Sequence, residues 1–97
     1  MIISITEPKK TFKETQGKWF VYILQCCDNS LYTGVTNNLE KRIQTHNNKK
    51  GAKYTRSRLP VVLKYYEIVN NKSSALKREI SLKKLTREQK LQLISTK

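Results

Sequence analysis

Two short apolar runs separated by a polar break begin the patterned part of the chain. Residues 19–26 and 31–35 are rich in aromatic and β-branched side chains, and residues 28–30 between them are Asp, Asn and Ser. This composition predicts two strands joined by a tight turn, that is, a β-hairpin. Residues 1–17 show neither helical nor strand periodicity. We interpret them as an N-terminal arm, either mobile or packed late onto a single domain that spans residues 18–95.

The length of the hairpin loop decides which side chains share a face of the sheet. Successive side chains of a strand point to opposite faces. A three-residue connection, Cys27–Asn29, would pair Tyr22 with Gly34 and Leu24 with Tyr32. Both tyrosines would then lie on one face as diagonal neighbours. A two-residue turn would separate them, so the loop length decides whether the two phenols can act together.

The next segment predicts a helix that begins after residue 36 or 37. Thr36 and Asn37 are good N-cap residues, and Glu40 lies three residues beyond Asn37, as in a capping box. In this helix Arg42 and His46 would flank the buried stripe. The i, i+3, i+4, i+7 spacing places four residues on one helix face, namely Leu39, Arg42, Ile43 and His46.

A long loop and a third strand follow this helix. Residues 47–59 are polar and strongly basic and have no apolar period, so we predict a loop. Long loops inside small domains are usually functional or disordered. Residues 61–69 then predict a strand with strict alternation. One of its faces would carry Leu63, Tyr65, Glu67 and Val69.

Two further helices are predicted after the third strand. Ser73 or Ser74 can cap the first, which extends to about residue 85. Thr86 and Gln89 have the spacing of a capping box at the start of the second. The predicted order of elements is therefore β-β-α-β-α-α. The apolar side of the first of these helices would consist of Leu76, Ile80 and Leu82.

The charge of the chain favours a polyanionic partner. Twenty Lys and Arg residues face seven Asp and Glu residues, which gives a net charge of +13. This excess creates a positive surface potential whichever way the chain folds. Nucleic acid is the first polyanion to consider, because cations that neutralise phosphates release condensed counterions. Solubility or structural packing on RNA would explain the same charge, so charge alone supports binding and says nothing about cleavage.

The N-terminal segment and the cysteines bear on the cellular compartment. Residues 1–5 form too short an apolar run for a secretory signal, and no long apolar run suits a membrane span. Cys26 and Cys27 are adjacent, a spacing that fits neither a redox motif nor a zinc half-site. We infer a cytoplasmic protein in which both cysteines are reduced thiols, one of them buried.

Two tyrosines, an arginine and a histidine are the candidate catalytic residues. Tyrosines usually pack in sheets, but Tyr22 and Tyr32 as a pair could activate water if adjacent cations or a metal favour the phenolate. Arg42 can donate two parallel hydrogen bonds to a phosphate, or it is an ordinary surface arginine. His46 could donate to a phosphate, assist proton transfer, or serve as a partner of the helix C-terminus.

Glu79 is the candidate metal ligand. Five carboxylates lie beyond residue 17, and the other four have ordinary structural explanations. Solvation or an ion pair would explain Glu79 equally simply. A single carboxylate disfavours two-metal chemistry but suits one Mg²⁺ held with waters and a substrate phosphate. The candidate nucleic-acid-binding residues, which a solvated loop would also explain, are Lys49, Lys50, Lys53, Tyr54, Arg56 and Arg58.

Five of these residues, in order, resemble the landmarks of the GIY-YIG nuclease superfamily over roughly residues 18–85. The segment Gly51–Arg56 is similar to a small, single-domain and largely uncharacterised bacterial branch of it. The resemblance implies an α/β domain of the α+β type, with a central three-stranded antiparallel sheet flanked by helices. The landmark residues are Tyr22, Tyr32, Arg42, His46 and Glu79.

The resemblance also implies a function. It predicts an endonuclease that depends on Mg²⁺ or Mn²⁺ and hydrolyses DNA, with branched or damaged DNA as candidate substrate and DNA repair as candidate process. One tyrosine would help to activate water, Arg42 and His46 would stabilise the phosphate, and Glu79 would bind the metal. A protein partner would supply target choice. The alternative is a DNA-binding or RNA-associated module that kept the fold and lost turnover.

Overall fold

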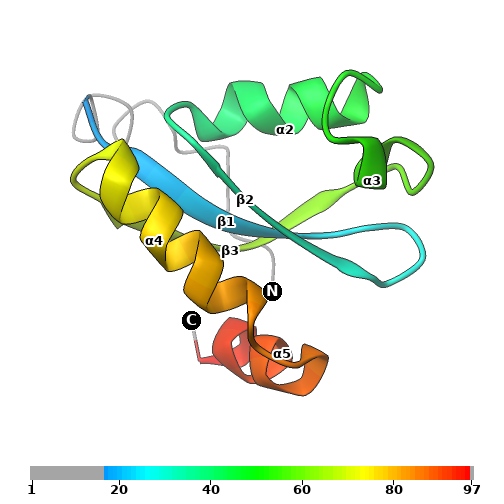
Figure 1. Ribbon diagram of the computed structural model, residues 1–97. Helices are drawn as coiled ribbons and strands as arrows, with labels where there is room; N and C mark the ends of the chain where they lie inside the picture. The colour runs from blue at the N-terminus through cyan, green and yellow to red at the C-terminus, as the bar shows by residue number, and fades with distance from the viewer. Residues whose placement is uncertain (1–16, 97) are drawn as a thin grey trace.

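The computed structural model describes residues 17–96, so the predicted N-terminal arm lies outside the described residues except for Gly17. Within residues 17–96, three strands and four helices form one small α+β domain (Figure 1). This confirms the predicted fold class. In chain order the elements are β1 (Trp19–Gln25), β2 (Leu31–Thr36), α2 (Leu39–Asn47), α3 (Lys53–Arg56), β3 (Val62–Val69), α4 (Lys72–Lys83) and α5 (Arg87–Ser95).

The sheet is antiparallel throughout, in the order β2-β1-β3, with β1 at its centre. The three-residue loop of the β1–β2 hairpin is present: Tyr22 pairs with Gly34 and Leu24 with Tyr32, which confirms the register. Asn29 in this loop has a positive φ of 70°, a conformation that asparagine tolerates better than most residues. Both tyrosines therefore lie on one face of the sheet.

The pairing of β1 with β3 contains an irregularity that the sequence did not reveal. Ile23 pairs with Tyr65 and Leu24 with Leu63, so Lys64 is an extra residue in β3. Such a bulge reverses the alternation of the strand. The predicted common face for Leu63 and Tyr65 is therefore wrong, and Leu63 packs in the same cluster as Leu24.

Helices cover both faces of the sheet, so the domain has two core clusters. On one face, α2 packs over a cluster formed by Tyr22, Leu24, Cys26, Ile43, Val61 and Leu63. On the other face, Ala75 and Leu82 of α4 pack against Val21 of β1. The residues at the margin of this cluster are Trp19, Val35, Val69, Leu85 and Leu93. Figure 1 shows α2 and α4 on different sides of the strands.

Two of the three predicted helix caps are displaced. Asn38, not Thr36 or Asn37, caps α2 by accepting a hydrogen bond from Lys41 N, so the expected capping box with Glu40 does not form. Thr36 instead accepts a hydrogen bond from Asn38 N. The predicted Thr86–Gln89 capping box of α5 is confirmed.

The N-terminus of α4 and its buried side also differ from the prediction. Asn71, rather than Ser73 or Ser74, caps the helix through a 2.8 Å hydrogen bond from Ser74 N. Ala75 and Leu82 are buried against the sheet, whereas the predicted core residues Leu76 and Ile80 are exposed. Ala75 and Leu82 are seven residues apart and therefore lie on the same side of the helix, which is the side that packs on the sheet.

The remaining predictions concern the basic segment, the cysteines and the membrane. Residues 47–59 are not a continuous loop, because α3 forms one helical turn inside them. Both cysteines are free thiols, with Cys26 buried and Cys27 exposed, as predicted. Within residues 17–96 no helix has the length and apolar character needed to cross a membrane.

Candidate active site

The site is built around the buried phenol of Tyr22. Its ring extends from β1 across the neighbouring strand and lies over Gly34, where a Cβ atom would come within 2.5 Å of Tyr22 Oη and 2.7 Å of Cζ. Glycine is therefore required at this position in β2 for steric reasons. The ring centroid of Tyr32 is 6.5 Å away from that of Tyr22, and Tyr32 is only half-buried.

His46 lies at the end of α2 and has no exposed surface. Its Nε2 is 3.1 Å from Tyr22 Oη, and its Nδ1 is 2.8 Å from Thr55 Oγ1. Gly51 packs against the ring, because a Cβ there would lie 2.8 Å from His46 Cγ and 2.9 Å from its Cα. Both ring nitrogens already have partners, so His46 reaches a substrate only through Tyr22.

Arg42, one turn before His46, connects the phenol to the outside of the domain. Its Nε donates to Tyr22 Oη at 3.4 Å, and the side chain is half-buried. Among the described residues no carboxylate pairs with this guanidinium. Arg42 thus presents an uncompensated positive charge beside Tyr22, as a phosphate-binding group requires.

Burial and the arginine act on the ionisation of Tyr22 and His46. Burial raises the pKa of Tyr22, and the hydrogen bond and charge of Arg42 act against this increase. Burial, with a smaller contribution from Arg42, lowers the pKa of His46 to about 4. His46 is therefore neutral at pH 7, so one of its ring nitrogens carries a proton and the other accepts a hydrogen bond.

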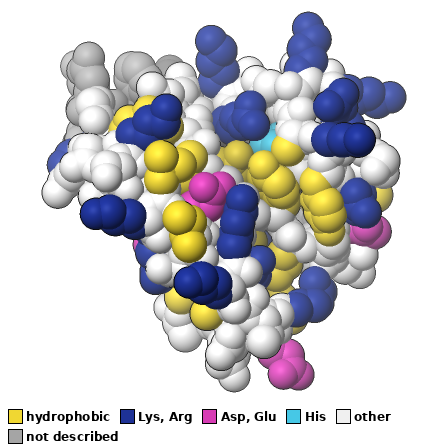
Figure 2. All heavy atoms as spheres, in the orientation of Figure 1, with side chains coloured by type: hydrophobic (Ala, Val, Ile, Leu, Met, Phe, Trp, Pro, Cys, Tyr) yellow, Lys and Arg dark blue, Asp and Glu magenta, His cyan; other side chains and the backbone are white. Residues whose placement is uncertain are grey.

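Glu79 approaches the site from α4. Its side chain is 17% exposed and forms an ion pair with Lys83 at 3.2 Å. The negative charge of Glu79 raises the pKa of Tyr22, so this carboxylate acts on the phenol. Figure 2 shows a face of the molecule on which apolar and basic side chains surround a small acidic area. Within residues 17–96 no three His, Cys, Asp or Glu side chains cluster as a metal site.

The predicted nucleic-acid-binding segment divides into free and engaged residues. Lys49, Lys50, Lys53 and Arg56 are exposed. By contrast, the Arg58 guanidinium lies 3.9 Å from the Tyr54 ring centroid, pairs with Asp28 at 3.1 Å and donates to Tyr54 O.

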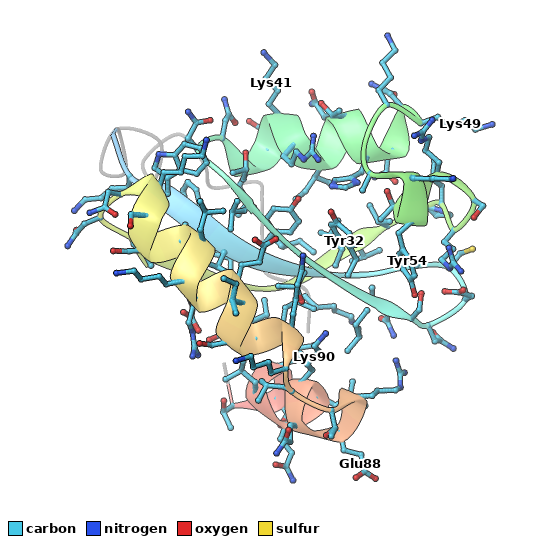
Figure 3. The ribbon with its side chains drawn as sticks, in the orientation of Figure 1. Tyr32, Lys41, Lys49, Tyr54, Glu88 and Lys90 are labelled. Atoms are coloured by element: carbon cyan, nitrogen blue, oxygen red, sulfur yellow. The ribbon has the colours of Figure 1, made fainter. Side chains whose placement is uncertain are left out.

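Tyr54 is itself part of the site wall. It is 41% exposed and stacks against Tyr32, with 6.0 Å between the ring centroids. Figure 3 shows the two labelled tyrosines next to each other. Arg58 and Tyr54 therefore brace Tyr32 from the side of α3.

Sequence reasoning missed Thr55 and the steric role of Gly51. Thr55 is fully buried and bonded to His46, although it stands in a basic segment that reads as a loop. One feature of the sequence could have pointed to this segment. Gly51 is one of three glycines in the chain, and it lies in the segment that resembles a bacterial branch of the superfamily.

Comparison with known proteins agrees with this geometry. The family model of the GIY-YIG catalytic domain matches residues 18–92. The chain belongs to the GIY-YIG family. The resemblance seen in the sequence is thereby confirmed. A GIY-YIG domain suggests nuclease activity and implies a nucleic acid substrate.

Within the GIY-YIG family, the relatives are small bacterial UPF0213 proteins. A UPF0213 protein of Clostridium perfringens is 67% identical over 80% of this chain and 84% of its own length. One of Syntrophus aciditrophicus is 58% identical over 80% of this chain and 91% of its own length.

Solved structures support the same assignment. The solution NMR structure of the Bacillus halodurans UPF0213 protein BH0048 has a TM-score of 0.54 at 44% identity, covering 82% of this chain and 85% of that one. The solution NMR structure of the protein EF2693 from E. faecalis has a TM-score of 0.56 at 42% identity, covering 81% of this chain and 84% of that one.

Proposed function

We propose that this protein is a metal-dependent endonuclease that hydrolyses phosphodiester bonds in DNA. Branched or damaged DNA is the proposed substrate, and DNA repair in the cytoplasm is the proposed setting. One observation carries the proposal, namely the chain of hydrogen bonds from Arg42 through Tyr22 to a neutral His46. The charge of Glu79 acts on the same phenol. A purely structural tyrosine needs none of these neighbours.

Each residue has a role that its surroundings support. Arg42 binds the scissile phosphate and stabilises the charge that grows on it in the transition state. Tyr22 takes the proton of the attacking water, while the Arg42 hydrogen bond favours the phenolate against the effect of burial. Tyr32, half-buried beside Tyr22, orients the water or the phosphate at the rim of the site.

The residues present fit a single divalent cation. Glu79 is a mostly covered carboxylate that forms an ion pair with the exposed Lys83. Mg²⁺ and Mn²⁺ accept one carboxylate together with waters and a phosphate oxygen, so a larger set of protein ligands is not needed. When bound, such a cation would lower the pKa of its water and neutralise charge on the phosphate.

The exposed cations bind the phosphate backbone of DNA. Lys49, Lys50, Lys53 and Arg56 all project from the α2–α3 side. Contacts of this kind are made to phosphates and carry no sequence information. We therefore propose that target choice comes from DNA structure or from a protein partner.

The ion pair of Glu79 favours a second candidate function. If Lys83 occupies this carboxylate permanently, the protein is a DNA-binding or RNA-associated module without turnover. Both candidates predict salt-sensitive binding, so only cleavage separates them.

The test is cleavage of supercoiled plasmid and of a branched DNA with Mg²⁺, Mn²⁺ or chelator. We expect cutting that requires metal and is lost in Glu79→Gln. Glu88→Gln, which removes an exposed carboxylate of α5, is the matched control and should cut normally. Cutting that survives in Glu79→Gln would refute the assignment of the metal ligand, and binding without cutting by all three proteins would favour the binding module.

A further inference from the structure

The hydroxyl of Thr55 occupies a position that a packing role does not require. It is fully buried in α3, and its Oγ1 lies 2.8 Å from His46 Nδ1 and 2.9 Å from the carbonyl oxygen of Ala52. A hydroxyl has one proton to donate, whereas a carbonyl oxygen can only accept. The direction of the Thr55 hydrogen bond therefore decides which nitrogen of His46 carries the proton.

Two arrangements of the protons are possible. In the first, Thr55 donates to Ala52 O and accepts from His46 Nδ1–H, so Nε2 is bare and accepts the proton of Tyr22. In the second, Thr55 donates to Nδ1, and Nε2–H donates to Tyr22 Oη. The Tyr22 hydroxyl proton then has no partner within the network.

Burial favours the first arrangement. Tyr22 is 1% exposed, and an unpaired buried donor costs about 1–3 kcal/mol. The first arrangement gives every proton of the network an acceptor and forms one more hydrogen bond than the second. Arg42 Nε donates to Tyr22 Oη in both, so it does not change the balance.

We propose that Thr55 is a positioning residue that holds His46 in the Nδ1–H tautomer and so makes Nε2 the acceptor of the Tyr22 proton. The catalytic part of this proposal rests on the proposed nuclease function. The step is concerted: as the oxygen of the attacking water bonds to phosphorus and the bond to the leaving oxygen breaks, the water proton moves to Tyr22 Oη and the Tyr22 proton moves to Nε2. Transfer before attack would place the proton of a phenol of raised pKa on an imidazole whose pKa is about 4. Thr55 Oγ1 accepts from Nδ1–H throughout.

The tautomer can be measured without any substrate. His46 is the only histidine in the chain, so ¹⁵N-histidine labelling gives one pair of ring signals. At pH 7 we expect a protonated Nδ1 and a bare Nε2 in the native protein. Thr55→Val, which keeps the shape but removes the acceptor, should shift the population towards Nε2–H, and Thr55→Ser should restore it.

Thr45→Val is the matched control. Thr45 is also a hydroxyl residue next to the site in sequence, but its hydroxyl donates to Lys41 O of its own helix and not to His46. This variant should leave the His46 signals in place. A protonated Nε2 in the native protein would overturn the proposal directly, even if Thr55→Val did not fold.

Activity provides the second measurement. With Mg²⁺ and DNA, Thr55→Val should lower kcat about 100-fold, the scale of one acid–base contribution, with KM unchanged and recovery in Thr55→Ser. A normal kcat in Thr55→Val would overturn the positioning role. If the native tautomer is as expected but no variant and no native protein cuts DNA, the proposed nuclease function fails and the tautomer assignment stands.

Discussion

The polar groups lie at different depths on the two faces of the sheet. Under α4 and α5 the buried cluster around Ala75 and Leu82 is apolar, and the contacts of Glu67 with Arg78 and Tyr65 are only partly buried. Under α2 the core also contains a buried chain of hydrogen bonds that joins Tyr22, His46 and Thr55. A hydrophobic core requires mainly volume, whereas a buried polar network requires particular atoms in particular directions.

This difference indicates which face carries chemistry. On the α4 side, the charge of Glu79 acts on Tyr22, while Ala75 and Leu82 supply packing. On the α2 side, Gly34 and Gly51 lack side chains because the rings of Tyr22 and His46 occupy that space. Changes in the apolar cluster of the first face should therefore affect stability alone, and changes on the second face should affect ionisation as well.

Leu82→Ala should have the largest effect on stability. The side chain is 1% exposed, and its truncation leaves a cavity, so we expect a loss of about 2–5 kcal/mol in the free energy of unfolding. Urea denaturation measures it. Leu91→Ala, at a residue that is 40% exposed, is the control and should lose far less. Equal losses would mean that the apolar face is not packed as described.

The pH dependence of stability should isolate the polar face. The pKa of His46 is lowered to about 4 from 6.5, so below pH 6.5 the unfolded chain takes up a proton that the folded protein does not. The folded state therefore loses stability as the pH falls to 4, by roughly 3 kcal/mol in total. The groups that face His46 are Tyr22, Tyr32, Arg42 and Thr55.

Carboxylates also titrate in this range, so the measurement is the difference between native protein and His46→Gln. Urea unfolding at pH 7 and at pH 4 should show a steeper loss for the native protein. Leu82→Ala should lower stability at both pH values without changing this difference. An identical slope in native protein and His46→Gln would contradict the lowered pKa.

The sequence predicted the parts of the fold that depend on local spacing. The three-residue hairpin loop set the parity that pairs Tyr22 with Gly34, and the Thr86–Gln89 box depends only on neighbouring residues. The extra Lys64 in β3 and the burial of Ala75 instead of Leu76 were missed, because both are decided by packing between distant elements.

The same distinction applies to the site. The candidate residues Tyr22, Tyr32, Arg42 and Glu79 could be named from their order in the chain. In the structure Tyr32 and Arg42 lie beside Tyr22, and the charge of Glu79 acts on the same phenol. Thr55 could not be named, because a threonine in a basic, polar segment has no periodicity that marks it as buried. Its role depends on one helical turn, α3, which has no side-chain cap.

Gly34→Ala should disturb the polar face with a moderate loss of stability. The new Cβ would stand 2.5 Å from Tyr22 Oη, so the ring must move away from it. Overpacking of this kind typically costs about 1–3 kcal/mol. Because Tyr22 would leave His46, the ¹⁵N signal of Nε2 should shift together with the loss in urea denaturation. An unchanged Nε2 signal would show that the phenol does not depend on this glycine.

Lys83→Met should have the smallest effect on stability and an effect on metal binding. The lysine is 54% exposed, and an exposed i,i+4 ion pair contributes about 0.3–0.5 kcal/mol. Removing it frees the Glu79 carboxylate, so Mn²⁺ affinity should rise about twofold, the equivalent of that energy. Titration followed by the electron paramagnetic resonance of free Mn²⁺ measures it. Lys84→Met is the control, because it removes a neighbouring exposed charge that has no ion pair among the described residues. If both variants change Mn²⁺ affinity equally, the cation responds to net charge and not to Glu79. Glu79 of α4 would then not form a metal site together with the residues on the α2 side of the sheet.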